Sequence, residues 1–257
     1  MKILSDPQEV IRWRRTDAAH RDVGLVPTMG GLHAGHGSLI RRCREESAQC
    51  VVSLFVNPTQ FNDPRDLKTY PDSLDADTAM CREAGVDLLF TPTYDRLYPD
   101  GYRYRVIETD MSRLLCGANR PGHFDGVLAV VTKLLNIVGP RRAYFGEKDY
   151  QQLQLVKGLA AALFLPVEIV ACPTVREPDG LAMSTRNQNL SPQERQKAGR
   201  FSHLLAGEGS AEAVRAALEA AGFDVDYVAD FGGRRCAAVN VGAVRLIDNR
   251  PLAGGAA

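Results

Sequence analysis

Short apolar runs alternate along this chain with stretches of helical period. Apolar runs rich in β-branched residues predict buried strands at residues 23–26, 50–56, 86–91, 142–145 and 167–172. Stretches of period 3.6 predict helices at residues 37–48, 73–84, 124–138 and 150–163. Strands that alternate with helices are the signature of βαβ units, so we expect an α/β protein with a Rossmann-like, doubly wound parallel sheet.

The pattern changes after Cys172. Proline at positions 173, 178 and 192 and an Asp179-Gly180 turn signal predict a long loop. Helices near Ser191-Pro192 and at 210–221 and strands at 225–229 and 237–247 follow it, and a frayed tail is expected at 254–257. We therefore predict a Rossmann-like domain at residues 1–174 and a smaller α/β C-terminal domain at residues 175–257.

Composition excludes some partners. Lys plus Arg and Asp plus Glu both number 31, so no net field attracts the chain to nucleic acid or to an anionic membrane surface. The most apolar stretch, 158–167, contains Pro166 and is far too short to span a bilayer. We expect neither a nucleic acid nor a membrane as partner, and any anion must be held by a local site.

The cysteines favour a reducing compartment. The chain has six, with no Cys-x-x-Cys pair and no spacing typical of a disulfide or zinc framework. They are expected to be reduced, buried and small apolar residues. The N-terminus has no apolar segment of the kind found in signal peptides, so we expect a cytoplasmic protein.

The stretch Pro27-Thr-Met-Gly-Gly-Leu-His-Ala-Gly-His36 places two of the five histidines between a predicted strand and a predicted helix. Loops at this edge of a doubly wound sheet bind ligands, because helix N-termini direct free N–H groups into them. His33 and His36 could donate hydrogen bonds to phosphate oxygens. They could also form half of a metal site or have a structural role, and the motif alone leaves these alternatives open.

Further motifs help to choose among these roles for His33 and His36. His33-Ala-Gly-His36 resembles the H-x-G-H signature of the class I nucleotidyltransferase and synthetase superfamily, whose second signature is a loop of K-M-S-K-S type. Four other stretches complete a pattern that resembles the pantothenate synthetase (pantoate–β-alanine ligase) family: Asn57–Phe61, Arg120–Phe124, Gly146–Gln152 and Asp179–Asn187, the last with Met183-Ser-Thr-Arg186 in the K-M-S-K-S position.

The resemblance implies an ATP-dependent ligase that forms a carbon–nitrogen bond. In that reaction pantoate attacks the α-phosphorus of ATP to give pantoyl adenylate and pyrophosphate, and β-alanine then displaces AMP to give pantothenate. Pantoate, β-alanine and ATP with Mg²⁺ are thus the expected small molecules. The resemblance also implies a homodimer.

The resemblance assigns roles to individual residues. His33, His36 and Lys148 are the expected catalytic groups, with Lys148 at the α-phosphate. The expected ATP-binding residues are Met29, Gly30, Gly31, Leu32, His33, Ala34, Gly35, His36, Gly146, Glu147, Lys148, Asp149, Val175, Met183, Ser184, Thr185 and Arg186. Arg186 would grip the β- and γ-phosphates in a loop that closes over ATP as a lid.

Glutamines are expected to select the acid. Gln60 and Gln152, supported by Asn57, match the pantoate- and β-alanine-binding positions, where an amide offers both a donor and an acceptor. Asp77 matches an acidic position associated with the metal, although Asp72 and Ala76 depart from the family pattern near it. His123 is a further pocket candidate, with a surface position as its alternative.

Two differences from the family pattern leave other functions possible. Thr185 stands where the family usually has serine, and the C-terminal domain reads as shorter than is usual for the family. Rival interpretations are a superfamily nucleotidyltransferase that acts on a phosphorylated acceptor, and a weakened nucleotide-binding protein with a shortened lid. The first would need additional Arg or Lys in place of Gln60 and Gln152, and the second would be expected to lose one of His33, His36, Lys148 or Arg186.

Overall fold

The computed structural model describes residues 1–71 and 73–252, so Asp72 and the tail expected to fray lie outside the described residues. The chain forms two compact units. The first contains Met1–Gly146 and Gln151–Cys172, and the second contains Glu147–Tyr150 and the chain from Pro173 onward. The short segment Glu147–Tyr150 therefore packs with the second unit, although its flanking residues belong to the first.

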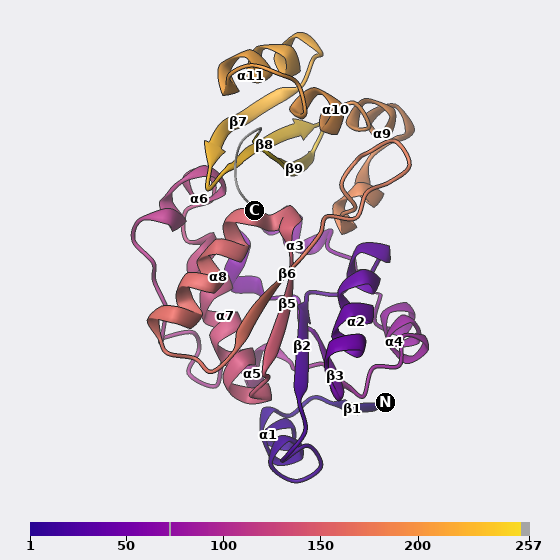
Figure 1. Ribbon diagram of the computed structural model, residues 1–257, viewed down its shortest axis with the longest axis vertical. Helices are drawn as coiled ribbons and strands as arrows, with labels where there is room; N and C mark the ends of the chain where they lie inside the picture. Colours follow the sequence, from indigo (N-terminus) through magenta and orange to yellow (C-terminus); the bar gives the residue numbers. More distant parts are fainter. Residues whose placement is uncertain (72, 253–257) are drawn as a thin grey trace. The chain divides into compact units, whose positions relative to one another are not determined.

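The first unit is built on a six-stranded sheet in the order β1-β4-β3-β2-β5-β6 (Figure 1). Every neighbouring pair of strands in this sheet is parallel. The strands are β1 (Lys2–Leu4), β2 (Val23–Thr28), β3 (Gln49–Leu54), β4 (Leu88–Phe90), β5 (Arg142–Gly146) and β6 (Glu168–Cys172). The predicted doubly wound parallel sheet is confirmed, and β1, which the hydrophobic pattern did not indicate, adds a strand at its edge.

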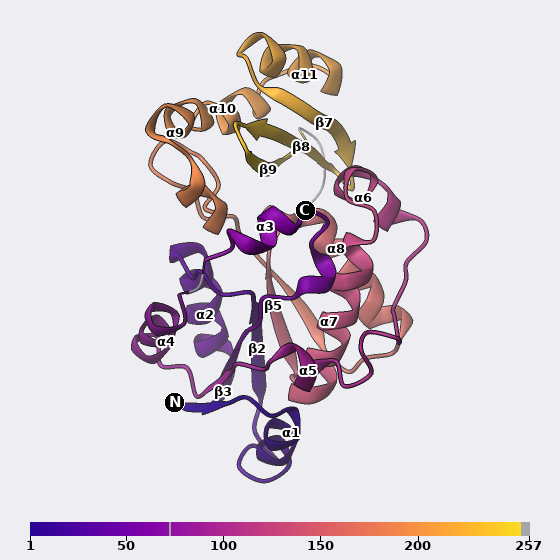
Figure 2. The same ribbon diagram turned by 180° about the vertical axis from the view of Figure 1, so that it is seen from behind.

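Helices cover both faces of this sheet (Figures 1 and 2). On one face, α2 (Ala34–Glu46) and α4 (Leu74–Glu83) place Ile40, Cys43 and Cys81 against side chains from β2 to β6. On the other lie α7 (His123–Val138) and α8 (Tyr150–Ala162). The remaining helical elements of this unit are α1 (Pro7–Arg15), η1 (Pro58–Gln60), α3 (Pro64–Lys68), α5 (Tyr94–Leu97), η2 (Met111–Arg113) and α6 (Leu115–Asn119).

Local sequence explains where these helices begin and end. Asp6 caps α1 by accepting a hydrogen bond from the Gln8 N–H, with Pro7 in the first turn. The apolar stripe of α7 is buried as its periodicity predicted, and the helix ends at Gly139, which has the left-handed conformation that favours glycine. Helix α2 differs from the prediction, because it begins at Ala34 and not near Gly37. The His-x-Gly-His motif is therefore part of the helix start.

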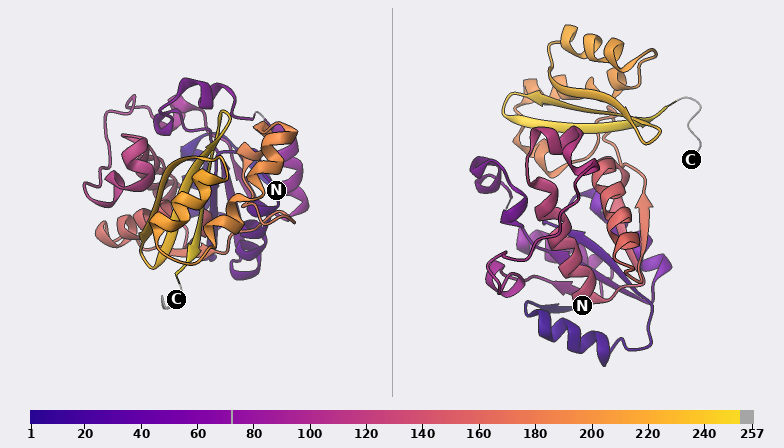
Figure 3. Two further views of the ribbon diagram at one scale, coloured as in Figure 1. Left: turned by 90° about the horizontal axis from the view of Figure 1, so that it is seen from above. Right: turned by 90° about the vertical axis from the view of Figure 1, so that its left-hand side faces the viewer.

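The second unit holds an antiparallel sheet in the order β7-β8-β9 (Figure 3). Its strands are β7 (Asp224–Phe231), β8 (Arg234–Val241) and β9 (Val244–Pro251), and its helical elements are η3 (Glu147–Asp149), η4 (Thr185–Asn189), α9 (Pro192–Ala198), α10 (Phe201–Leu205) and α11 (Ala211–Ala220). The core includes Val214 and Leu218 of α11 against Val225 and Val239 of the sheet. This unit confirms the predicted second, smaller α/β domain.

One predicted strand of the second unit is wrong. The apolar run 237–247 is two strands, because Gly242 adopts φ +59° and turns the chain back so that Val241 pairs with Val244. Positive φ is available to glycine without steric cost, and the two-residue loop Gly242-Ala243 makes a tight hairpin. The surrounding β-branched residues gave the run the pattern of one continuous strand.

All six cysteines are free and buried, as their scattered spacing predicted. They behave as small apolar core residues, with Cys43 and Cys81 in the layer between the sheet and its helices. Within residues 1–71 and 73–252, no helix combines the length and apolar character that crossing a membrane requires.

The close approach of α7 to η1 gives a stability prediction. A Cβ at Gly126 would lie 2.5 Å from the Thr59 carbonyl oxygen and 2.7 Å from the Gln60 nitrogen, both of which are backbone atoms. We expect Gly126→Ala to lower the free energy of unfolding by about 1–3 kcal/mol through overpacking. Urea denaturation measures the change.

The matched control is Gly158→Ala on the exposed side of α8, where a Cβ meets nothing within 4 Å. Alanine is favoured over glycine within a helix, so this variant should gain roughly 0.5–1 kcal/mol. Equal effects of the two substitutions would contradict the assignment of a steric constraint to Gly126.

Candidate active site

Strands β2 and β5 are neighbours at the point where the strand order reverses. From β2 the chain proceeds to β3 and β4 on one side, whereas β5 is followed by β6 on the other. Ligands of doubly wound sheets bind beyond the carboxyl ends of the strands at such a switch point. The loop that follows β2, with the His-x-Gly-His motif at its end, therefore lies where the fold favours a ligand.

The two histidines form the N-terminal cap of α2. The Gly35 N–H donates to His33 Nδ1 at 3.1 Å, and the His33 N–H donates to His36 Nδ1 at 3.3 Å. The rings lie with their centroids 4.2 Å apart. Since each Nδ1 is an acceptor, the proton of each neutral ring lies on Nε2. The motif thus closes the helix start and fixes which nitrogen of each ring is a donor.

Asp77 of α4 holds the glycine loop that precedes His33. Its Oδ2 accepts a hydrogen bond from the Gly31 N–H and its Oδ1 accepts one from the Leu32 N–H, both at 2.8 Å. Ser73 also donates to Oδ2 at 3.0 Å, and the carboxylate is buried. Both oxygens are thereby engaged by the loop, so a metal at Asp77, which stays a prediction, would compete with these bonds.

Glycine is required where this loop turns. Gly30 has φ +89° and Gly31 has φ +64°, values that side chains other than glycine rarely adopt. A Cβ at Gly30 would also lie 3.0 Å from Asp77 Oδ2. Gly30, Gly31 and Gly35 are buried, Met29 and Leu32 are half-buried, and Ala34 is exposed.

Gln60 is oriented by a buried hydrogen-bond network centred on Asn57. The Asn57 amide donates to Gln60 Oε1 at 2.9 Å and to the Gly126 carbonyl at 3.1 Å. Its own oxygen accepts from the hydroxyls of Thr59 and Tyr98 at 2.9 and 3.1 Å. Burial raises the pKa of Tyr98 to about 12, so this hydroxyl remains a donor at neutral pH.

The consequence for Gln60 is a fixed amide orientation. Because Oε1 accepts from Asn57, the donor Nε2 lies on the other side of the amide, 3.2 Å from Met29 Sδ. A thioether is a weak acceptor, so an incoming carboxylate or hydroxyl oxygen is a better partner for this donor. Asn57 is fully buried and acts by orienting Gln60.

His123 is buried and does not lie on the surface. Its Nδ1 lies 2.8 Å from the Gln60 carbonyl oxygen, and its Nε2 lies 3.1 Å from Arg120 Nη1. Arg120 Nη2 also donates to the Gln60 carbonyl at 3.2 Å. The Arg120–Phe124 motif therefore holds the backbone of Gln60, while Asn57 holds its side chain.

The adjacent glutamines of α8 have different environments. Gln151 is buried and uses its amide to hold the 111–116 segment, with bonds to Met111, Leu114 and Cys116. Gln152 is half-buried at the start of the same helix. The structure thus separates a structural glutamine from the one that the sequence proposes as a substrate contact.

The remaining predicted residues lie in the second unit. Lys148 occupies η3, where its side chain is 18% exposed and Nζ lies 3.7 Å from Asp149 Oδ1. Glu147 forms an ion pair with Arg234 of β8 at 3.1 Å. Both residues directly follow Gly146, the last residue of β5, so the chain passes from the sheet edge into the second unit at this motif.

The Met183-Ser-Thr-Arg186 stretch follows a narrow loop. The Met183 N–H donates to the Val175 carbonyl at 3.0 Å, and Arg176 and Ala182 form an antiparallel bridge across the loop. Ser184 then caps η4 by accepting from the Arg186 N–H at 3.3 Å, and Thr185 is buried. The threonine methyl group is therefore accommodated in the interior.

Several residues of this arrangement were not predicted as site residues. Thr59, Tyr98 and Gly126 complete the Asn57 network, and Ser73 supports Asp77. Only Gly126 carried a local signal, as a glycine inside a predicted helix. Within the described part of the chain, no group of three or more His, Cys, Asp or Glu side chains could hold a metal ion.

The fold and this loop define the class. A doubly wound parallel sheet whose switch-point helix begins with His-x-Gly-His is typical of the α/β nucleotidyltransferases and synthetases with that signature. The chain belongs to the pantoate–beta-alanine ligase family, since the family model described as "Pantoate-beta-alanine ligase" matches residues 2–251. The predicted family is confirmed.

Individual relatives match this chain over nearly their whole length. Pantothenate synthetase of Bdellovibrio bacteriovorus is 52% identical over 248 residues, which cover 96% of this chain and 98% of that protein. A crystal structure of pantoate-beta-alanine ligase from Francisella tularensis, complexed with beta-gamma ATP and beta-alanine, has a TM-score of 0.92 at 39% identity and covers 98% of this chain and 97% of its own. Pantothenate synthetase from Thermus thermophilus has a TM-score of 0.89 at 43% identity, with 98% and 99% covered.

These relatives bear on the expected truncation. Each is matched over at least 97% of its own length. The C-terminal domain is therefore not tens of residues shorter than theirs, and the expectation of a shortened lid does not hold against them. The interpretation as a weakened protein loses the observation on which it was based.

The contacts of Asp77 with the backbone of Gly31 and Leu32 give a testable prediction. In Asp77→Asn, one oxygen becomes an NH₂ group that faces a backbone N–H, which leaves a buried donor without its acceptor. We expect a loss of about 1–3 kcal/mol in the free energy of unfolding together with weaker ATP binding. Thermal unfolding and equilibrium titration with ATP measure the two effects.

Asp75→Asn on the exposed face of the same helix removes the same charge and is the control. It should change stability by less than about 0.5 kcal/mol. If both variants bind ATP as tightly as the parent protein, the carboxylate of Asp77 does not shape the loop for nucleotide.

Proposed function

We propose that this chain condenses pantoate with β-alanine to form pantothenate, using ATP and releasing AMP and pyrophosphate. The observation that carries the proposal is the full-length family match to a chain whose His-x-Gly-His pair caps a helix at the switch point of the sheet. The four residues of which a weakened protein would be expected to lose one, His33, His36, Lys148 and Arg186, are all present.

The first half-reaction transfers the adenylyl group of ATP to pantoate. A carboxylate oxygen of pantoate forms a bond to the α-phosphorus of ATP, and the bond from that phosphorus to the bridging oxygen of pyrophosphate breaks. Catalysis of such a step depends on positioning and on stabilisation of charge at the phosphoryl oxygens. We assign the cation at the α-phosphate to Lys148, and the Nε2–H donors to His33 and His36.

The neutral form suits these histidines. Each Nδ1 accepts a backbone hydrogen bond, so protonation there would remove a cap of α2. The rings can then serve as oriented donors without taking part in proton transfer, which the attack by a carboxylate does not require. The N–H groups at the start of α2 add positive potential near the same loop.

Selection of pantoate is assigned to Gln60 and Gln152. Asn57 sets the amide of Gln60 so that Nε2 is available as a donor to a hydroxy acid. A donor without positive charge holds the pantoate carboxylate without neutralising it, so the carboxylate stays nucleophilic. A phosphorylated acceptor would call for Arg or Lys at these positions, which disfavours the nucleotidyltransferase alternative.

The second half-reaction is an acyl transfer. The amine of β-alanine attacks the carbonyl carbon of pantoyl adenylate, the amide bond forms as the amine loses a proton, and AMP departs.

We assign binding of the β- and γ-phosphates of ATP to Ser184, Thr185 and Arg186, because the planar guanidinium can bind pyrophosphate through paired hydrogen bonds. Met183 and the backbone of Val175 complete that assignment.

Magnesium is proposed to enter with ATP, held by phosphate oxygens and water. The described residues contain no cluster suited to a resident metal, which supports this role. The proposal also includes a homodimer and a cytoplasmic location. Six buried, free cysteines are compatible with a reducing compartment.

Turnover measurements test the proposal directly. With ATP, Mg²⁺, pantoate and β-alanine, AMP release should depend on both pantoate and β-alanine, and pantothenate should form in equal amount. Mass spectrometry of the product and a coupled AMP assay provide the measurement. Pyrophosphate release that continues over many turnovers without β-alanine would instead support a nucleotidyltransferase, and intact ATP binding without turnover would support a nucleotide-binding protein.

Lys148→Ala tests the assignment at the α-phosphate. Loss of one preorganised charge-stabilising group lowers a rate by roughly 10²–10³. We expect that reduction in adenylate formation, followed as pyrophosphate release in a single turnover, with an unchanged melting temperature. Lys157→Ala on the exposed side of α8 is the control and should be fully active. Near-normal pyrophosphate release in Lys148→Ala would remove this lysine from the mechanism.

A further inference from the structure

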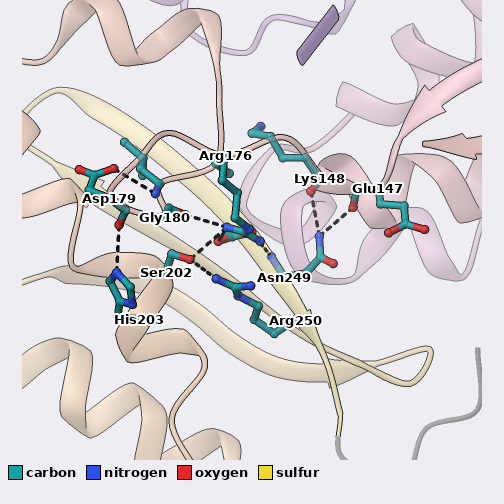
Figure 4. A network of polar contacts seen from close by, with 12 residues as sticks. Glu147, Lys148, Arg176, Asp179, Gly180, Ser202, His203, Asn249 and Arg250 are labelled. Carbon is teal, nitrogen blue, oxygen red and sulfur yellow. Dashed lines mark hydrogen bonds and ion pairs between the residues drawn. The ribbon is translucent and has the colours of Figure 1, made fainter. Parts of the chain in front are cut away.

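The Arg245–Asn249 stretch has no role in the reaction as assigned above. It forms part of β9, the last strand of the second unit. Asn249 is only 3% exposed, and its amide points at the segment that carries Lys148 (Figure 4). Asn249 Nδ2 donates to the Glu147 carbonyl at 2.8 Å and to the Lys148 carbonyl at 3.0 Å.

These bonds supply hydrogen-bond donors to backbone carbonyls of η3. A three-residue 3₁₀ segment leaves backbone carbonyls without partners of its own, and in the half-buried η3 segment they need donors from elsewhere in the chain. One amide satisfies two consecutive carbonyls across 101 and 102 positions of sequence. The side-chain ion pair of Glu147 with Arg234 and the bond from the Tyr150 hydroxyl to the Gly232 carbonyl, at 2.7 Å, fix the flanks of the same segment.

Asn249 is itself fixed through the residue before it. Its backbone N–H donates to Asp248 Oδ1 at 2.8 Å, and Asp248 forms a paired contact with Arg176 at 2.7 and 2.9 Å. The Asp248 side chain is 1% exposed. Arg176 also donates to the Gly180 carbonyl and to Ser202 (Figure 4), and both distances are 3.0 Å.

The network therefore connects two segments to which phosphate binding is assigned, the one that carries Lys148 and the loop that carries Arg186. Arg176 lies at the base of the loop that leads to Ser184 and Arg186, and Asn249 holds the backbone of Lys148. Asp248 and Asn249 are adjacent on one strand and join the two. All of these contacts lie within the second unit.

We propose that Asn249 is a positioning residue, which sets the backbone of Lys148 for attack at the α-phosphate and ties it through Asp248 and Arg176 to the loop carrying Arg186. The inference rests on the proposed function, because it concerns how Lys148 acts. An amide is required at this place, since both carbonyls need a donor and a carboxylate has none to offer. Small displacements of a catalytic group cost large factors in rate.

The test compares Asn249→Ala and the isosteric Asn249→Asp with a control, Asn240→Ala. Asn240 lies on β8 of the same sheet and uses its amide on Asp224 and Asp226, away from η3. Pyrophosphate release in a single turnover reports the first half-reaction. Attack of β-alanine on pantoyl adenylate supplied directly reports the second, in which Lys148 has no assigned role.

We expect both Asn249 variants to slow the first half-reaction by about 10- to 100-fold, with the KM for pantoate and the second half-reaction changed less than about twofold. Asn240→Ala should leave both half-reactions intact. Equal losses in the two half-reactions, or variants too unstable to fold, would assign Asn249 to stability alone and overturn the proposal. Full activity of both variants would overturn it as well.

A double-mutant cycle with Lys148→Ala completes the test. If Asn249 acts through Lys148, Asn249→Ala should have little further effect on the first half-reaction in the Lys148→Ala background. Multiplicative losses would contradict that coupling. The parent protein separates the two proposals: if it makes no pantothenate, the proposed function fails, whereas an active parent with additive variants refutes only the role of Asn249.

Discussion

The reversal of strand order between β2 and β5 is the constraint on which the remaining features depend. Parallel strands bring their carboxyl ends to one edge of the sheet, so the segments that follow them are placed there by topology. The segment after β2 supplies the His-x-Gly-His helix start, and β5 ends at Gly146 in the motif that contains Lys148. The sheet thus determines where these segments begin, and polar contacts determine their conformation.

Those polar contacts follow a common rule. Chain that lies outside helices and strands keeps N–H and C=O groups that need partners. The carboxylate of Asp77 accepts from two consecutive N–H groups, and the amide of Asn249 donates to two consecutive carbonyls. In each case an acceptor side chain meets backbone donors, or a donor side chain meets backbone acceptors. Asn57 likewise donates, both to the Gly126 carbonyl and to Gln60 Oε1, and thereby orients the amide of Gln60.

Features that depend on nearby residues could be predicted from the sequence, whereas those that join distant residues could not. The periodicity of α7 and the Asp6-Pro7 start of α1 are local, and both appear as expected. The start of α2 at Ala34, capped by His33, was missed because histidine is not a usual capping residue. The contacts of Asp77 with Gly31 and of Tyr98 with Asn57 join residues more than 40 positions apart, so no spacing rule reveals them. The family resemblance located the candidate residues, but it did not say which of them hold others in place.

The membership of Glu147–Tyr150 in the second unit makes that unit discontinuous in sequence. The four residues lie between Gly146 and Gln151 of the first unit, so no single cut of the chain separates the two units intact. A fragment that begins at Pro173 would keep Asn249, Arg234 and Gly232 but lose the segment they contact. The fragment that ends at Cys172 would keep Lys148 without the strands that hold its backbone. A cut near residue 173 therefore does not yield two complete units. A chimera that exchanges the second unit between homologues must also exchange the Glu147–Tyr150 segment.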